Sequence, residues 1–196
     1  MGSRKQVDRS RTTTATLVTA AGELFGNDGY ANVSIDEVAA AAGVSKGAVY
    51  HHFDGKPSLF AAVFTHAQRQ LAERLHAEAD GASTGWEAVR LGSHAFLRAC
   101  LVPAVRQVIV LDAPTVLGRD EVRRIEEEHV AHLLVAGLRR AEQEGSVRPG
   151  NSELRSHLIL GVLCEAALAL ARSLDPEQDL ARVSAEVDTL LEAYRT

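Results

Sequence analysis

The chain has 196 residues, of which 46% are hydrophobic and 24% charged, and it carries a formal net charge of −5 at pH 7. No uninterrupted apolar run reaches the roughly 18 residues that a membrane-spanning helix needs, so we expect no membrane partner. The first ten residues are polar and basic, unlike a secretory signal peptide. The two cysteines, Cys100 and Cys164, lie in apolar sequence, which predicts buried free thiols in a cytoplasmic protein.

Charge is distributed unevenly along the chain. Residues 1–56 contain six basic and six acidic side chains, whereas the remaining residues contain 15 basic and 20 acidic ones. Every lysine lies at or before Lys56. Only the N-terminal part can therefore approach a polyanion such as DNA without net repulsion.

Apolar residues recur at helical spacing along the whole chain, and there is no convincing β alternation, which predicts an all-α fold of about nine helices. The first helix is predicted over Ser10–Asn27, where it meets a turn-rich segment at residues 26–29. Ser34 and the glutamate three residues later form a capping box that marks the start of the second helix. Gly43 suits the left-handed position that ends this helix.

The third helix is predicted to begin at Ser45 and to end near His52, and Pro57 suits the first turn of a fourth helix that fades near Asp80. Five further helices follow, separated by prolines and glycines. They are a stripe from Trp86 to Cys100 ended by Pro103, a short helix from Val105 to Leu111 ended by Pro114, a long helix from Val122 closing at Gly145, an apolar helix over Leu154–Leu174, and a last helix opening at Pro176.

The second and third helices are separated by Ala-Gly-Val-Ser at residues 42–45, a spacing typical of a helix-turn-helix whose second helix enters the major groove of DNA. Lys46 can donate to guanine, and Gly47 lets the helix backbone approach the base edges. Tyr50 and His51 can donate to phosphate oxygens. The candidate DNA-binding residues are Ser34, Ser45, Lys46, Gly47, Tyr50, His51 and Lys56.

Ser34 and Ser45 are candidates because the free N–H groups at a helix N-terminus favour a phosphate. Val49 and Phe53 are predicted to form the buried side of the third helix. Spacing alone also fits a plain structural corner, because a helix–glycine–helix connection is common in all-α proteins. Tyr50 would then be a core aromatic residue and the neighbouring histidine a surface residue.

Residues 16–64 read TLVTAAGELFGNDGYANVSIDEVAAAAGVSKGAVYHHFDGKPSLFAAVF. The stretch resembles the N-terminal domain of the TetR family of bacterial transcriptional regulators. It carries, in order, A-x-x-L-F, G-Y, the core I-x-x-V-A-x-x-A-G-V-S-x-G-x-x-Y-x-H-F, and K-x-x-L-F. His52 is a small departure, at a position that varies in the family. The resemblance implies a DNA-binding domain over residues 1–55 and a ligand-binding and dimerisation domain over residues 56–196.

The resemblance further implies an all-helical homodimer that regulates transcription, most commonly a repressor that a small-molecule effector releases from a palindromic double-stranded DNA operator. The effector would tilt the fourth helix and move the two recognition helices out of register with successive major grooves. No enzyme activity and no cofactor are implied. The segment LDAPTVLG at residues 111–118 also resembles a subgroup of these regulators, but it does not indicate a ligand.

The last two helices are the candidate dimer interface. The helix over Leu154–Leu174 is apolar on most sides and must be buried on two of them, against its own subunit and against a partner. The last helix offers a second stripe through Leu180, Val187 and Tyr194. Four such helices from two chains would form a bundle. The alternative is that both helices belong to a monomer core.

The effector site is predicted among the helices between Phe64 and Leu138, where polar groups lie on apolar faces. Asp112 is the first choice, because a carboxylate in apolar sequence needs a partner, either a cationic ligand or Arg106. Each polar residue could instead be a satisfied core group or a surface residue. The candidate ligand-binding residues are Trp86, His94, Leu97, Arg106, Asp112, His129, His132 and Glu165.

Two functions other than transcriptional regulation are possible for a helical protein of this composition. A helical enzyme or metal-binding protein would use His94, His129, His132 and Asp112, but His129 and His132 are not part of an H-E-x-x-H motif and no catalytic spacing is present. A helical adaptor would show no salt-dependent binding to DNA. The helix-turn-helix residues argue against the adaptor.

Overall fold

We describe a computed structural model of the chain, covering the backbone of residues 2–196 and the side chains of residues 10–196. The side chains of Arg4, Lys5 and Arg9, and the residue Met1, lie outside the described part. Over residues 2–196 the fold is helical, with no β-strand and a single isolated bridge between Val147 and Arg195. Joining contiguous helical segments gives nine helices in this part of the chain, as predicted.

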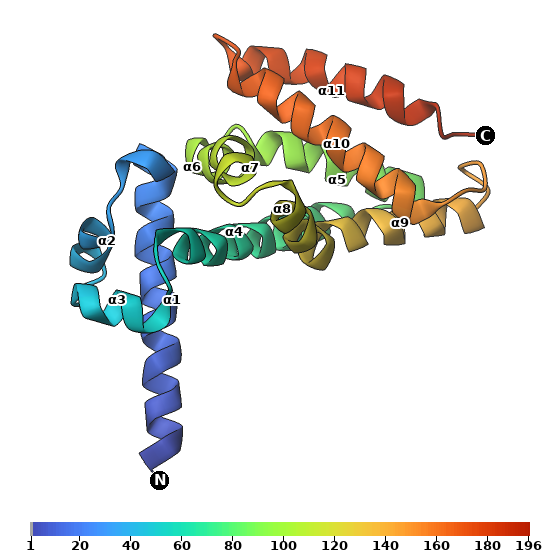
Figure 1. The fold of residues 1–196 in the computed structure, drawn as a ribbon. Coiled ribbons are helices and arrows are strands. Elements are labelled where there is room, and N and C mark those ends of the chain that lie inside the picture. Colours follow the sequence, from blue (N-terminus) through green and yellow to red (C-terminus); the bar gives the residue numbers. More distant parts are fainter. Residues whose placement is uncertain (1) are drawn as a thin grey trace.

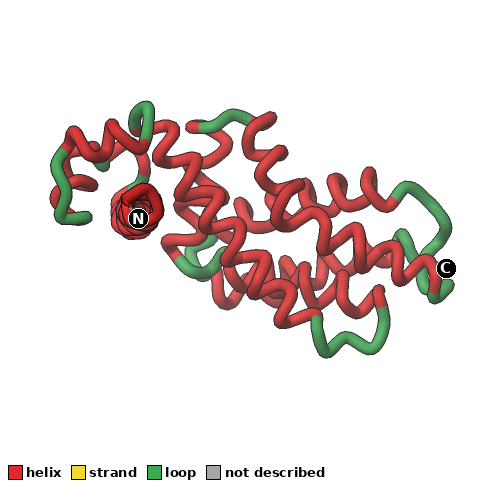
Figure 2. The backbone as a smooth tube through the Cα atoms, turned by 90° about the horizontal axis from the view of Figure 1, so that it is seen from below, coloured by secondary structure: helices red, strands yellow, loops and turns green. Residues whose placement is uncertain are grey.

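The N-terminal unit contains three helices and is followed by a long fourth one. Its elements are α1 (Gly2–Asp28), the 3-10 turn η1 (Tyr30–Asn32), α2 (Ile35–Ala41), α3 (Lys46–His52) and α4 (Lys56–Ala79). Figure 1 shows α2 and α3 beside the upper half of α1, while α4 leaves at a steep angle toward the rest of the molecule. From below, α1 is seen end-on and nearly all remaining helices extend to one side of it (Figure 2).

The C-terminal part contains five helices, of which the first three pack against α4. They are α5 (Gly85–Ala99), a helix built of α6 (Pro103–Val105), η2 (Arg106–Asp112) and α7 (Ala113–Val116), a helix built of α8 (Arg119–Glu126), η3 (Glu127–Ala131) and α9 (His132–Gln143), then α10 (Ser152–Ala171) and α11 (Pro176–Glu192). Both η2 and η3 are π-helical. Helices α10 and α11 form an outer layer at the side away from α2 and α3 (Figure 1).

Local capping explains where the short helices begin. The Ser34 hydroxyl accepts a hydrogen bond from the Glu37 amide at 3.2 Å, while the Glu37 carboxylate accepts one from the Ser34 amide at 2.7 Å. The Ser45 hydroxyl caps α3 by accepting from the Ala48 amide. Between the two helices, Gly43 has a φ of 67°, a left-handed conformation that glycine adopts without strain. The predicted capping box and corner are confirmed.

Two predicted boundaries were wrong. Helix α1 begins at Gly2 rather than at Ser10, because no proline or glycine interrupts residues 3–21. Pro114 does not end its helix, since it lies in the first turn of α7, where a missing N–H costs little. The π-helical register of η2 leads directly into that turn, and the Ala113 amide donates to the Val108 carbonyl five residues back.

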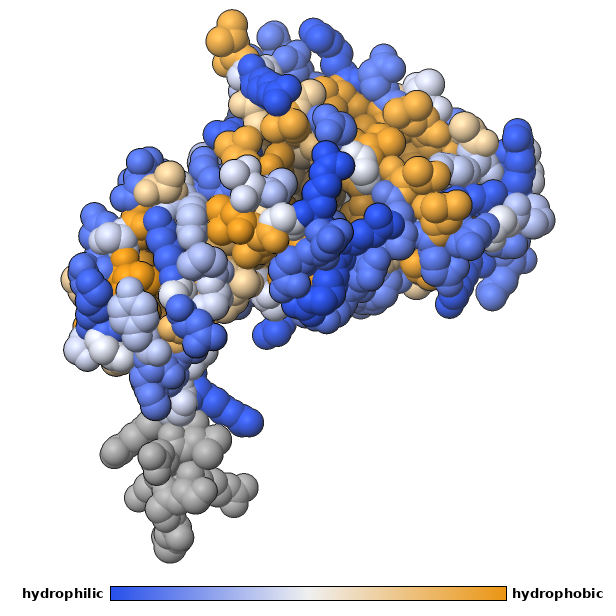
Figure 3. Space-filling model, viewed as in Figure 1, coloured by the Kyte–Doolittle hydropathy of each residue, from blue (hydrophilic) through white to orange (hydrophobic). Residues whose placement is uncertain are grey.

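Helix α10 is long and apolar enough to span a membrane by length and composition alone, in contrast to the expectation from uninterrupted apolar runs. About a third of its apolar window is buried inside the fold, where it packs against α9, α11 and α5. Leu154 and Leu158 remain more than half exposed on its other side. Figure 3 shows hydrophobic surface gathered over α10 and its surroundings.

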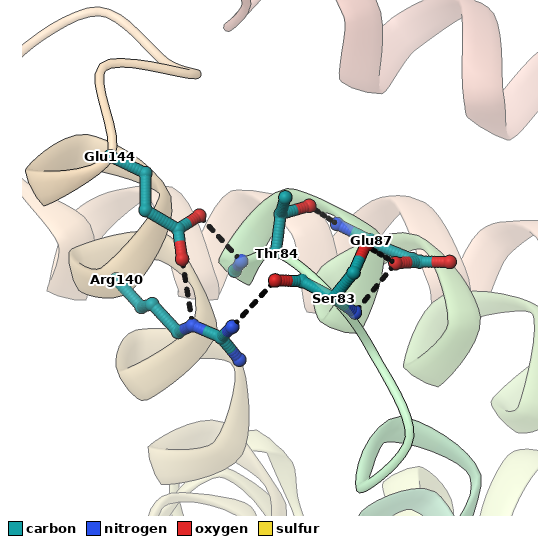
Figure 4. Close-up of polar contacts among 6 residues, drawn as sticks. Ser83, Thr84, Glu87, Arg140 and Glu144 are labelled. Carbon is teal, nitrogen blue, oxygen red and sulfur yellow. Dashed lines mark hydrogen bonds and ion pairs between the residues drawn. The ribbon is translucent and has the colours of Figure 1, made fainter.

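The turn between α4 and α5 is fastened to the end of α9 by a polar cluster (Figure 4). The Arg140 guanidinium donates to the Ser83 carbonyl at 2.8 Å and to the Glu144 carboxylate at 2.8 Å. The same Glu144 carboxylate accepts from the Gly85 amide, so it satisfies a donor at the N-terminus of α5. Ser83 also binds Glu87 through both its amide and its hydroxyl. These bonds fix the crossing of α5 and α9.

The same crossing depends on the absence of a side chain at Gly85. A Cβ atom there would lie 2.4 Å from the Ala141 amide nitrogen and 2.6 Å from the Gly137 carbonyl oxygen, both of which are backbone atoms of α9. The two helices can meet at this distance only because residue 85 is glycine. At Gly92, on the same helix, an added Cβ would meet nothing within 4 Å.

We expect Gly85→Ala to destabilise the fold by about 1–3 kcal/mol, because α5 and α9 must move apart. For a chain of this size each kcal/mol lowers the melting temperature by about 2–4 °C. Gly92→Ala is the matched control and should leave the melting temperature unchanged or raise it, because alanine is the better helix former by about 0.5–1 kcal/mol. Equal melting temperatures for the two variants would contradict the proposed steric constraint.

Candidate nucleic-acid interface and ligand cavities

Helix α3 has one buried and one exposed side. Val49 is fully buried against the N-terminal core, as predicted, whereas Phe53 is only partly buried. Tyr50 is 52% exposed, and His51 and Gly47 are also exposed. A helix with this exposure can present its free side to a groove in DNA.

Lys46 is held at the start of α3 by an ion pair. Its Nζ atom lies 2.9 Å from the Asp36 carboxylate of α2, and both side chains are more than half exposed. This hydrogen bond raises the pKa of Lys46, so the side chain stays protonated. An exposed pair of this kind contributes little to stability, so Lys46 can exchange Asp36 for an acceptor on DNA at small cost.

The two serines differ in their surroundings. Ser34 is engaged twice by Glu37, whose carboxylate accepts from both the Ser34 amide and the Ser34 hydroxyl at 2.7 Å. A phosphate would have to displace that carboxylate to bind here. Ser45 caps α3 with no carboxylate on its hydroxyl and is exposed. Ser45 is therefore the better placed of the two for a phosphate.

Lys56 lies at the start of α4, directly after the N-terminal unit of α1, α2 and α3, which we call the DNA-reading unit. Its Nζ atom lies 4.2 Å from the centre of the Tyr30 ring, within the range of a cation–π contact. The Tyr30 ring in turn packs edge-on against Phe60 at 5.1 Å. At the end of α3, the His52 ring shares a hydrogen bond with the Thr14 hydroxyl of α1 at 3.2 Å. Helix α3 is thus bonded to α1 at its C-terminal end through His52, and to α2 at its N-terminal end through Lys46.

The first cavity has a volume of about 320 Å³ and lies between α4, α5, α9 and α10. Its walls are mainly apolar and include Leu75, Phe96 and Leu134. The polar groups at its edge are His76 and Asp80 at the end of α4 and Arg140 of the cluster in Figure 4. This volume is at the lower end of the range for sites that hold small ligands.

The second cavity has a volume of about 640 Å³ and lies between the η2–α7 segment, α8 and α10. Ile109, Val110 and Leu168 supply apolar wall, and Glu126 faces the same space. Burial raises the pKa of Glu126 to about 7, with Arg123 acting in the opposite direction. A third, shallower groove of about 720 Å³ runs between α10 and α11.

The predicted ligand-binding residues are scattered, and of the eight only Glu165 lines a cavity, the second one and the α10–α11 groove. Trp86 and Leu97 belong to the buried core. His94 binds Asp188 of α11 at 2.8 Å, which ties α5 to the last helix. Asp112 accepts a hydrogen bond from the Tyr30 amide at 2.8 Å instead of facing a ligand or Arg106.

The remaining predicted residues lie on different helices and do not come together. Arg106 is half-buried near the start of η2, where its charge opposes the rise in the pKa of Cys100 that burial causes. His132 is exposed, and His129 is half-buried with a ring nitrogen, Nε2, that has no hydrogen-bond partner. Over the described residues, no three His, Cys, Asp or Glu side chains are grouped to hold a metal ion. The metal-binding alternative therefore lacks a site built from these residues.

Apart from Glu165, the residues that line the cavities were not predicted from the sequence. His76, Asp80 and Arg140 border the first cavity, and Glu126 and Arg119 border the second. A usable signal was the concentration of small residues at helix crossings, since Gly85 and Gly137 mark where α5 approaches α9.

Both cysteines are free, and burial raises the pKa of both thiols to about 12. Cys100 is buried, whereas Cys164 is only partly buried and lines the second cavity.

Two family models match the chain. Residues 17–63 match the model described as bacterial regulatory proteins, tetR family, which covers the DNA-reading unit and the start of α4. Residues 86–194 match the model described as tetracyclin repressor-like, C-terminal domain. The second match alone covers more than half of the chain and includes all residues that line the second cavity and the α10–α11 groove, and part of those that line the first cavity.

Individual proteins agree with these matches. The chain is 26% identical over 163 residues to the Transposon Tn10 TetC protein of Escherichia coli, covering 83% of this chain and 82% of that protein. A solved TetR-family transcriptional regulator from Pectobacterium atrosepticum has a TM-score of 0.84 at 31% identity, covering 96% of this chain and 97% of that one. The FadR regulator of Bacillus subtilis, solved with stearoyl-CoA, shares the fold with a TM-score of 0.73 at 22% identity, covering 90% and 96%.

The half-buried carboxyl group of Glu126 leads to a prediction about how stability depends on pH. Because its pKa of about 7 in the fold exceeds the ordinary 4.5, the stability contributed by the neutral form is present below about pH 4.5 and is lost as the pH rises through 7. We expect Glu126→Gln to be more stable than the parent at pH 8, by at most about 3 kcal/mol, and to lose that advantage at pH 5. Thermal melts at both pH values measure this.

Glu73→Gln, at an exposed position of α4, is the control for the loss of one negative charge. It should shift the melting temperature equally at both pH values. A pH-independent effect of Glu126→Gln would show that Glu126 is ionised in the fold without penalty.

Proposed function

The chain belongs to the TetR family of bacterial transcriptional regulators, and from this premise we propose that it represses transcription as a homodimer on a palindromic operator and is released by a small-molecule effector. Several of its curated relatives are named HTH-type transcriptional regulators, which supports a regulatory role. The observation that carries the proposal is the exposed side of α3, with Lys46, Tyr50 and His51 on a helix held in a capped helix-turn-helix. A regulator of this kind would act on DNA in the bacterial cytoplasm.

We propose that some of these residues contact DNA bases and that others contact phosphates. Lys46 and Gly47 are proposed to face base edges, since α3 has no other lysine and no side chain at position 47 to hold the backbone away. Ser45, Tyr50, His51 and Lys56 are proposed to contact phosphates. Ser34 belongs to the same set with less support, because Glu37 engages its hydroxyl and its amide.

The proposed division into a DNA-binding domain over residues 1–55 and an effector domain over residues 56–196 places α4 at the boundary. The end of α4 borders the first cavity through Leu75, His76 and Asp80, while its beginning carries Lys56. A ligand in this cavity would therefore press on the helix that orients the DNA-reading unit. The small and mainly apolar cavity favours a small, mainly apolar effector.

The dimer is proposed to form through α10 and α11. Leu158 of α10 and Leu190 of α11 are 54% and 56% exposed, and both line the groove between the two helices. Exposed apolar groups along one face of two adjacent helices are typical of a bundle interface. A two-fold dimer would also present two copies of α3 to the half-sites of a palindrome.

We expect Lys46→Ala to reduce the preference for operator over a scrambled duplex by about tenfold or more, because a base contact carries discrimination. Tyr50→Phe should instead weaken binding to both duplexes equally, because it removes only a donor to phosphate. Fluorescence anisotropy with an operator selected from random duplexes measures both. Arg148→Ala, which removes a positive charge far along the chain from α3, should leave both affinities unchanged. Absence of salt-dependent binding to any duplex would refute the proposed function.

Leu158→Asp and Leu190→Asp, alone or together, are expected to convert the dimer into a monomer, because each places a charge in an apolar interface. Light scattering coupled to size exclusion measures the mass, and affinity for the full palindrome should fall with it. Val102→Asp changes an apolar residue that is 44% exposed outside the α10–α11 groove, and it should leave the mass unchanged. A dimer that survives both leucine substitutions would place the interface elsewhere.

A further inference from the structure

The segment LDAPTVLG contains the carboxylate that joins the two parts of the molecule. Asp112, the last residue of η2, accepts a hydrogen bond from the Tyr30 amide through Oδ2 at 2.8 Å, across 82 residues of sequence. Tyr30 begins the η1 turn, which leads directly into the Ser34 cap of α2. The bond therefore connects the effector domain to the start of the helix-turn-helix without involving α4.

The Tyr30 side of this hydrogen bond is held in place by aromatic packing. The Tyr30 ring lies 5.6 Å from the Phe25 ring of α1 and 5.1 Å from the Phe60 ring of α4, with Lys56 above it. A movement of Tyr30 would disturb the ends of both α1 and α4. The aromatic cluster thus passes any displacement at Asp112 to the helices that carry α2 and α3.

The same region allows little independent movement of the two parts. At Gly29, which has a φ of 79°, an added Cβ would lie 3.2 Å from the side-chain nitrogen Nε2 of Gln107 in η2. At Gly26 an added Cβ would lie 2.7 Å from the Ala104 Cβ of α6, closer than two such atoms can approach. The α6–η2 segment therefore lies directly against the end of α1, and the Gly26 contact requires glycine.

Another side of this segment forms part of the second cavity. Ile109, Val110 and Leu111 of η2 and Pro114 of α7 line it, facing α8 and α10. Asp112 lies between these residues in sequence but turns toward Tyr30 instead. One short helix therefore touches a ligand-sized space and the DNA-reading unit at once.

We propose that Asp112 is a positioning residue that couples occupancy of the second cavity to the orientation of the DNA-reading unit, by a route separate from α4. The proposal rests on the proposed function, since its main readout is DNA affinity. A bulky occupant would displace η2, and η2 would carry Asp112 and the Tyr30 amide with it. Without the carboxylate, the same occupant would displace the DNA-reading unit less, because only the packing of α6 and η2 against α1 would remain to transmit the movement.

A double-mutant cycle tests the coupling with a side chain as the occupant. Val122→Trp fills the second cavity from α8, and its effect on operator affinity is measured with Asp112, with Asp112→Asn and with Asp112→Ala. We expect Val122→Trp to weaken operator binding at least fivefold with Asp112 and with Asp112→Asn, whose side-chain oxygen still accepts a hydrogen bond. With Asp112→Ala the effect should be less than twofold. Equal effects in all three backgrounds, or no effect with Asp112, would overturn the proposal.

Asp120→Ala is the matched control, because it removes an exposed carboxylate from α8 and should leave the effect of Val122→Trp intact. If Val122→Trp melts without a cooperative transition, Leu168→Trp fills the same cavity from α10. The same outcomes then apply.

Amide hydrogen exchange at Tyr30 separates failure of this proposal from failure of the proposed function. Asp112→Ala should accelerate exchange at Tyr30 by about tenfold to a hundredfold, whereas Asp112→Asn should change it much less. Val122→Trp should alter Tyr30 exchange only when residue 112 carries a side-chain acceptor. The exchange measurements need no DNA. If the protein binds no duplex but shows these exchange rates, the proposed function is refuted and the proposed coupling through Asp112 is retained. If exchange at Tyr30 is unchanged in every variant, the coupling itself is refuted.

Discussion

Helix α4 is a single continuous helix that belongs to both parts of the molecule. Its 24 residues span about 36 Å. Near its start, Leu59, Phe60 and Val63 are buried, and α1 packs against this helix. Near its end, Leu75 borders the first cavity. Helix α4 supports both the DNA-reading unit and a wall of the first cavity. Because α4 is one rigid element, a displacement of α4 moves both of them together.

The N-terminal unit was predictable because its determinants are local. The capping box at Ser34, the left-handed Gly43 and the cap at Ser45 each act within a few residues, and all three are present as predicted. The buried Val49 follows from the same short-range pattern. Even here the partners of Lys46 and Lys56 were not predictable, because Asp36 and Tyr30 reach them through the tertiary fold.

The C-terminal part was predicted correctly as a set of helices but not as a set of cavity walls. The two π-helical segments explain part of this difference, because each extra residue per turn rotates the following face by about 100° relative to a regular α-helix. Asp112 ends η2, and His129 lies within η3, so a regular helical spacing assigns their directions wrongly. The partner of His94, Asp188, is 94 residues away in sequence, a distance no local pattern can bridge.

The ion pair between Lys46 and Asp36 has a consequence for how sharply an operator base would be read. A donor that loses all partners at a mismatched base imposes a large penalty, because it is buried unpaired. Lys46 instead keeps an alternative acceptor 2.9 Å away within its own subunit. At a mismatched base, the Lys46 ammonium group would bind the Asp36 carboxylate again and would not be left without an acceptor. Under the proposed function, a mismatch at that base would therefore cost the lost base contact alone, without the further penalty of an unpaired ammonium group.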